Sequence, residues 1–153
     1  MSKKPLVFLV CTGLGHVNRG YESFARECFE QLVQNDSFSL LLLKGGGKAN
    51  NNEKVIWNIP RNSKISLWIH KIVRNNAYIL EQGTFFIGML AALFKFKPDV
   101  IYYSDFQLGT YLWHLRKFLR FKYKLLFSNG APNGPPFTRM DHVQQLPPCK
   151  PIL

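Results

Sequence analysis

The stretch LVFLVCTGLGHVNRG, residues 6–20, decides the fold, because an apolar run leads through two glycines into a helical pattern. Residues 6–11 are apolar without interruption, which is typical of a strand covered on both faces. Gly13 and Gly15 permit positive φ and close backbone approach. The N-terminus of the helix that follows carries partial positive charge, which suits a phosphate or carboxylate. A plain tight turn is the alternative, because one G-x-G is a weak dinucleotide signal.

Length and composition predict one domain. The chain has 153 residues, 46% of them hydrophobic and 14% aromatic, which is enough for one core of ordinary size. Lys3, Lys4 and Pro5 lead straight into the first strand, which does not fit a secretory signal. We therefore expect a cytoplasmic protein with reduced thiols, Cys11 and Cys28 in its core, and no disulfide framework.

The chain is strongly basic, with 20 Lys and Arg against 9 Asp and Glu and a net charge of +11. Such a surface attracts anions at long range. Nucleic acid is not the expected partner, because no zinc-finger spacing, RNP motif or helix-turn-helix accompanies the charge. Basic and apolar residues alternate over 116–124, which suits an anionic membrane surface, with a solvated helix end as the alternative. This basic segment comprises Arg116, Lys117, Arg120, Lys122 and Lys124.

The longest apolar run is FFIGMLAALF, residues 85–94. It is too short to cross a bilayer, which needs about 20 residues. We predict a buried helix packed on the sheet, with a surface helix that dips into a membrane as the alternative.

Strand and helix patterns alternate along the chain. Apolar spacing predicts helices over residues 18–34, 66–74, 77–94 and 106–119, with Asn18 as the first cap. Short apolar runs predict further strands over 38–43, 99–104 and 123–127. The polar residues 48–63 are predicted to form a loop. This alternation predicts an α/β fold with right-handed βαβ units around a parallel sheet.

Small or polar residues follow three of the predicted strands, at 12–16, 104–105 and 128–130. The carboxyl ends of parallel strands meet at one edge, where ligands bind, so these residues predict a shared cleft that includes Asp105. The glycines at 45–47 with Lys48 look like a phosphate loop. The pattern G-x-x-x-x-G-K-[ST] is absent, however, which excludes a P-loop nucleoside triphosphatase.

Three segments carry a resemblance to a known family: GLGHVNRGYESFARECFEQL, YILEQGTFFIGMLAALFKFKPDVIYYSD and YKLLFSNGAPNGPPFTRMDHVQQL. In this order they resemble the N-terminal half of a GT-B glycosyltransferase of the family 4 type. The resemblance covers residues 5–146 and implies a single Rossmann-like domain that contributes acceptor recognition and one wall of the active cleft.

The resemblance also implies positions for site residues. Gly13, Gly15 and His16 in the first turn would lie near the donor diphosphate or the transferred sugar. Asn129 and Gly130 would lie there as well. The residues expected at the cleft or the acceptor are Asp105, Arg139 and Asp141.

GT-B enzymes of this type have a second Rossmann-like domain that holds the nucleotide. We expect residues 5–146 to form the acceptor-side domain and residues 147–153, with three prolines, to be a tail at a truncation point. The chain would transfer sugar from a nucleotide-sugar only when joined to, or paired with, a donor-binding half or subunit. No cofactor is expected. The alternative is a non-enzymatic basic α/β module that binds an anionic membrane, peripherally, or a partner protein.

Two histidines are candidates for catalysis. His16 would bind a phosphate or sugar hydroxyl, or act as a base, although packing beside the helix start is an equal alternative. His142, next to Asp141, is a weaker candidate, because adjacent side chains seldom face each other. No His, Cys and carboxylate cluster has metal-ligand spacing. Glu81 is expected to cap a helix rather than to face an acceptor.

Overall fold

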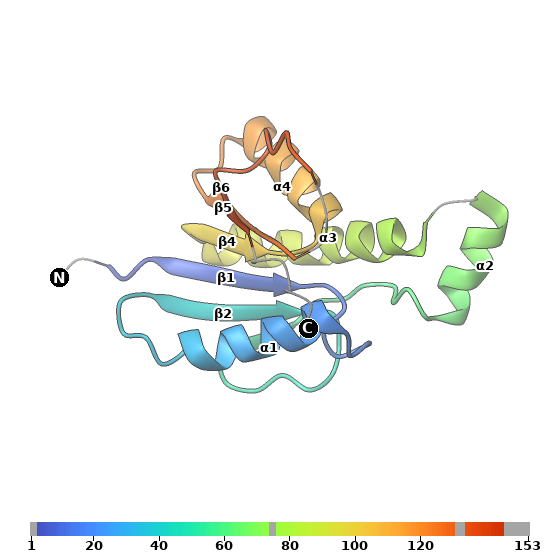
Figure 1. Ribbon diagram of the computed structural model, residues 1–153, viewed down its shortest axis with the longest axis horizontal. Coiled ribbons are helices and arrows are strands. Elements are labelled where there is room, and N and C mark those ends of the chain that lie inside the picture. The colour runs from blue at the N-terminus through green and yellow to red at the C-terminus, as the bar shows by residue number, and fades with distance from the viewer. Residues whose placement is uncertain (1–2, 74–75, 131–133, 146–153) are drawn as a thin grey trace, which may run out of the picture.

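The chain forms an α/β domain around a six-stranded sheet, and the computed structural model describes residues 3–73, 76–130 and 134–145 (Figure 1). Every strand pairing is parallel, and the strand order is β3-β2-β1-β4-β5-β6, the order of the Rossmann fold. The predicted Rossmann-like parallel sheet is therefore confirmed. The strands are β1 (Leu6–Cys11), β2 (Ser39–Lys44), β3 (Glu53–Val55), β4 (Val100–Tyr103), β5 (Lys124–Asn129) and β6 (His142–Gln145). The helices are α1 (Gly20–Leu32), α2 (Lys64–Val73), α3 (Ala77–Phe96) and α4 (Phe106–Leu119).

Strand β1 is central, and side chains from both of its faces are buried. Phe8 and Val10 point into a core shared with α3 and α4, while Leu9 and Cys11 point into a core shared with α1. This alternation follows from the period of two along a strand. It explains why residues 6–11 are apolar throughout, as is expected where helices cover both faces.

Two short edge strands correct the sequence prediction. β3 lies within residues 48–63, which were predicted to form a loop, and β6 was not predicted at all. Both are polar and mostly exposed, and they exist because their backbones pair with β2 and β5. Helix α1 begins at Gly20, so Asn18 is not its cap and instead accepts a hydrogen bond from the Ser23 hydroxyl at 3.1 Å.

Helix α3 packs on the sheet, as predicted, but only one side of it is buried. Phe85, Met89 and Leu93 are buried in the core, whereas Ile87 and Phe94 are exposed. Within the described part of the chain, α3 is the one helix whose length and composition would allow it to cross a membrane. The core helix of a soluble protein can meet the same criterion.

Candidate functional site

The glycine-rich turn after β1 packs against the glycine-rich turn after β2. The amide of Gly46 donates to the carbonyl of Leu14 at 3.0 Å. Gly15 has a φ of +92°, and a Cβ atom added to it would lie 2.2 Å from the backbone of Gly46. The second glycine of the G-x-G is therefore required by contact between two protein backbones.

Gly13 is required by a different neighbour. A Cβ atom at this position would lie 2.2 Å from Oε1 of Glu22 and 2.3 Å from Nη2 of Arg61. The turn therefore passes directly over an ion pair. These contacts favour the tight-turn interpretation, since they account for both glycines without a phosphate.

His16 is held in place by a side-chain contact. Its Nε2 lies 3.0 Å from Oδ1 of Asn58, and the amide nitrogen of Asn58 donates to the carbonyl of Thr12 at 3.3 Å. Since the Asn58 amide group is oriented by Thr12, its Oδ1 accepts a hydrogen from His16. The ring also lies against Gly46, where an added Cβ would come within 2.6 Å. These contacts match the packing alternative stated for His16.

The carboxyl ends of β1 and β4 form the centre of the site. These neighbouring strands are followed by helices on opposite faces of the sheet, which makes their boundary the switch point at which α/β proteins bind ligands. Asp105 follows β4, and its Oδ2 accepts hydrogen bonds from the Thr12 amide at 3.1 Å and the Thr12 hydroxyl at 2.9 Å. These bonds tie the two strand ends together.

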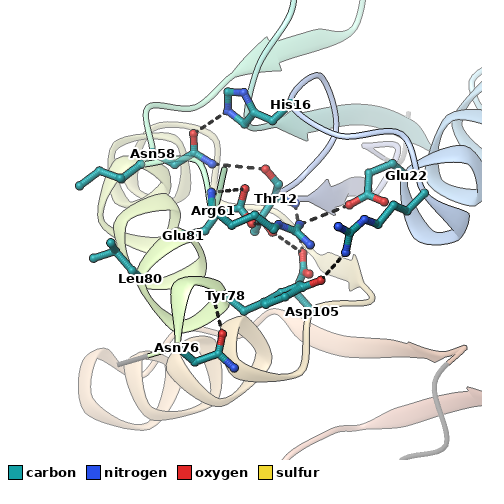
Figure 2. A network of polar contacts seen from close by, with 12 residues as sticks. Thr12, His16, Glu22, Asn58, Arg61, Asn76, Tyr78, Leu80, Glu81 and Asp105 are labelled. Carbon is teal, nitrogen blue, oxygen red and sulfur yellow. Dashed lines mark hydrogen bonds and ion pairs between the residues drawn. The ribbon is translucent and has the colours of Figure 1, made fainter. Parts of the chain in front are cut away.

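Arg61, in the connection between β3 and α2, forms ion pairs with one glutamate on α1 and one on α3. Its Nε donates to Glu81 of α3 at 2.5 Å, and its Nη2 lies 3.3 Å from Glu22 of α1 (Figure 2). The side chains of Arg61, Glu22 and Glu81 are exposed by only 10%, 4% and 0%. Glu81 is therefore an ion-pair partner and not the helix cap that was expected, because Asn76 caps α3.

Tyr78 covers this ion-pair network from the solvent side. The Arg61 guanidinium lies over the Tyr78 ring at 4.2 Å, and Arg19 donates to the Tyr78 hydroxyl at 2.8 Å. Figure 2 shows the Tyr78 ring beside Arg61. Tyr78 thus joins a buried cation to an exposed one.

Carboxylates outnumber cations at the floor of the site. Burial raises the pKa of Asp105, the nearby Glu22 carboxylate adds to the increase, and the Thr12 hydrogen bonds and Arg61 oppose it. Burial also raises the pKa of Glu81, against the effect of Arg61. Since Arg61 is already paired with two carboxylates, the floor does not offer a spare positive charge to a phosphate.

The electrostatic coupling of Asp105 to Glu22 and Arg61 can be tested by titration. Glu22→Gln is expected to lower the pKa of Asp105, because it removes a negative charge that disfavours ionisation of Asp105. Arg61→Met is expected to raise it, for the opposite reason. Carboxyl carbon chemical shifts followed by NMR over pH would measure both. Shifts in the same direction in the two variants would contradict this arrangement of charges.

A cleft of about 620 Å³ opens at this carboxyl edge of the sheet. Aromatic rings of Tyr21, Tyr78 and Phe106 line it together with polar groups. The other lining residues are Arg19, Gly20, Glu22, Phe24, Arg61, Gln82, Ser104, Asp105 and Gly130.

The structure brings only some of the predicted site residues to this cleft. Asp105 and Gly130 line it, and Asn129 ends the neighbouring strand β5. Asp141 lies at the other end of the sheet, where its carboxylate binds Arg116 and accepts from the Leu125 amide at 2.7 Å. Next to it, His142 begins the edge strand β6. Asp141, which was expected at the cleft, and His142, the weaker catalytic candidate, thus both lie away from this cleft, because β6 runs parallel to β5 and begins away from the carboxyl edge.

The basic segment also lies away from the cleft, and its cations differ in their surroundings. Arg116 binds Asp141 and donates to the Tyr123 carbonyl at 3.0 Å, so it has a structural role. Lys117 lies 4.2 Å from the centre of the Trp113 ring, and Arg139 lies over the same ring at 5.6 Å. The remaining members, Arg120, Lys122 and Lys124, are exposed.

Sequence reasoning missed Arg61 and Glu22 and gave Glu81 the wrong role, although the two glutamates left a signal. Glu22 shares the buried side of α1 with Ala25 and Phe29, at i, i+3 and i+7. Glu81 precedes the buried Phe85 and Met89 at i+4 and i+8. A charged residue in register with a buried stripe predicts a buried ion pair. The partner, Arg61, carries no comparable signal, because it lies in a connection without periodicity.

Among the described residues, no group of three or more His, Cys, Asp or Glu side chains is placed to hold a metal ion. In comparisons with known proteins, no protein-family model and no curated protein matches the chain.

Proposed function

We propose that this domain is the acceptor-binding half of a glycosyltransferase and that its ligand is a neutral, hydroxyl-rich molecule such as a sugar. The observation that supports this most directly is the cleft at the switch point between β1 and β4, which Asp105 lines together with four aromatic residues. The motif order that resembles the family 4 GT-B enzymes supports the reaction class.

The lining of the cleft is suited to a sugar. Aromatic rings, here Tyr21 and Phe106, pack against the apolar C–H faces of a pyranose, while a few polar groups fix its orientation. Both described hydrogen bonds to the Asp105 side chain go to Oδ2, which leaves Oδ1 for a ligand hydroxyl. A carboxylate whose pKa is raised by burial is also suited to accept a proton from that hydroxyl.

The charges favour an acceptor over a nucleotide. Departure of a nucleoside diphosphate places negative charge on the leaving phosphate, and cations or helix N-termini must stabilise it. The cleft contains Arg19 at its rim and Arg61 at its floor, and Arg61 is neutralised by Glu22 and Glu81. Cations for the diphosphate would therefore come from a donor-binding half, and the isolated chain would not transfer sugar.

Ligand-observed NMR would test this proposal. With a panel of methyl glycosides we expect saturation transfer at millimolar sugar, lost in Asp105→Asn and in Tyr21→Ala. The Asn oxygen would stay on the Thr12 donors and leave an NH2 donor in place of the Oδ1 acceptor, and Tyr21→Ala removes a stacking face. Gln34→Ala, an exposed substitution beyond α1, is the matched control and should leave binding unchanged. Uridine and guanosine diphosphates should bind more weakly than the sugars. Tighter diphosphate binding that is insensitive to Asp105→Asn would overturn the proposal.

A further inference from the structure

Helix α3 presents an apolar side to solvent. Ile87 and Phe94 are exposed by 62% and 52%, and Ala91, also exposed, lies on the same side of the helix at i, i+4 and i+7. Residues 83–94 include no charged side chain. A surface helix of a soluble domain normally turns charged or polar residues outward. We call Ile87, Ala91 and Phe94 the α3 outer face.

Aromatic side chains border this face on two sides. The backbone after β3 packs against the helix beside Ile87, since a Cβ atom on Gly88 would lie 2.5 Å from the Trp57 carbonyl oxygen. The Trp57 residue is 65% exposed. At the other end, the rings of Phe94 and Phe121 lie 5.4 Å apart. The apolar surface therefore extends beyond α3.

Cations lie near the Phe94 end of the α3 outer face, and acids are absent from the segments that form it. Lys54 and Lys95 lie 5.8 Å and 5.3 Å from the Phe96 ring, and both are exposed, as are Lys97 and Lys122. The sequence has no Asp or Glu over residues 54–80, 82–98 or 106–140. The exposed acids of the helices, Glu27 and Glu30, lie on α1, which covers the opposite face of the sheet (Figure 1), and the other exposed acids, Asp36, Asp99 and Asp141, lie outside the helices. Neither α2 nor α3 therefore presents an acid to solvent, since the one acid of these helices, Glu81, is buried.

Helix α2, which contacts α3, also presents cations and apolar side chains to solvent. Lys64, Leu67, Trp68 and Lys71 are all exposed and lie at i, i+3, i+4 and i+7, on one side of the helix. Figure 1 shows α2 projecting from the body of the domain, beyond the carboxyl ends of β1 and β2. Two cations and two large apolar side chains therefore share its outward side.

We propose that the α3 outer face, with Trp57 and the outward side of α2, docks on a membrane surface rich in anionic lipid. Apolar side chains that insert below the headgroups, flanked by cations that meet lipid phosphates, are the features of a helix lying in the interface plane. The α3 helix lies on the bilayer and does not cross it, because Phe85, Met89 and Leu93 on its other side are buried in the core. A nucleic acid would match the cations and stack on the aromatic rings, but it would not match the exposed aliphatic side chains of Ile87 and Leu67.

Vesicle flotation tests the proposal directly. The chain is expected to float with vesicles of phosphatidylcholine and phosphatidylglycerol and much less with phosphatidylcholine alone. Ile87→Asp with Phe94→Asp should weaken binding by about tenfold or more, because two inserted apolar groups are replaced by charges. Gln31→Asp with Gln34→Asp adds the same charge on the α1 side and should leave binding nearly unchanged. Equal losses in the two double variants would overturn the docking surface.

Three further measurements test insertion of the apolar side chains, the contribution of the cations, and dimerisation. Brominated lipid should quench the tryptophan emission of the bound chain, and Trp57→Phe with Trp68→Phe should abolish most of that quenching. Lys95→Gln with Lys97→Gln should reduce binding while leaving the apolar stripe intact. Bound chain without quenching would overturn insertion. Sedimentation would test for a second copy on this face. A dimer that Ile87→Asp with Phe94→Asp converts to a monomer, in a chain that does not float with vesicles, would assign the α3 outer face to a second copy instead.

Discussion

Replacing Arg61 with methionine is expected to lower the free energy of unfolding at neutral pH by about 3–5 kcal/mol. The reason is that the side chains of Glu22 and Glu81, exposed by 4% and 0%, would be left buried without their cation. Urea denaturation followed by far-UV circular dichroism would measure the loss. Glu81→Gln added to Arg61→Met should recover part of it, because the neutral amide removes one uncompensated charge.

The loss of stability in Arg61→Met should become smaller as the pH falls. Burial raises the pKa of Glu81 and Arg61 opposes the increase, so the folded-state pKa of Glu81 rises further when Arg61 is removed. A carboxyl group whose folded pKa exceeds its unfolded pKa contributes stability below the unfolded value and loses it as the pH rises through the folded value. The difference between Arg61→Met and the wild type should therefore shrink towards pH of about 4, where the carboxyl group is protonated. A difference below about 1 kcal/mol at neutral pH would contradict the role given to Arg61.

Gly15→Ala is expected to lower the free energy of unfolding by about 3 kcal/mol or more. Its φ of +92° strains any L side chain, and the new methyl group would lie 2.2 Å from the backbone of Gly46, which cannot rotate away. The two glycine-rich turns would have to separate, which would also break the bond between the Gly46 amide and the Leu14 carbonyl. Thermal and urea unfolding would report the change.

Gly20→Ala is the matched control for Gly15→Ala. It begins α1, and a Cβ atom there meets nothing within 4 Å. We expect unchanged or slightly increased stability, because alanine restricts the unfolded chain and favours the helix. Equal destabilisation by the two substitutions would contradict the backbone contact between the turns.

The sequence by itself determined the layers of the fold. Residues 6–11 are apolar throughout because β1 is buried on both faces, and this pattern is local and readable. The order of strands and helices similarly followed from periodicity. The short edge strands β3 and β6 were missed, because they bury little and owe their conformation to backbone pairing with β2 and β5.

Only the tertiary structure decided the composition of the cleft. Arg61 is 20 residues from Glu81 and 39 from Glu22, and the Asp105–Thr12 contact joins residues 93 positions apart. Local patterns cannot specify which charged groups meet over such separations, because the pairing depends on how the helices are placed on the sheet. For the same reason, the glycines at 13 and 15 suggested a phosphate in the sequence, whereas in the folded chain they accommodate an ion pair and a neighbouring backbone.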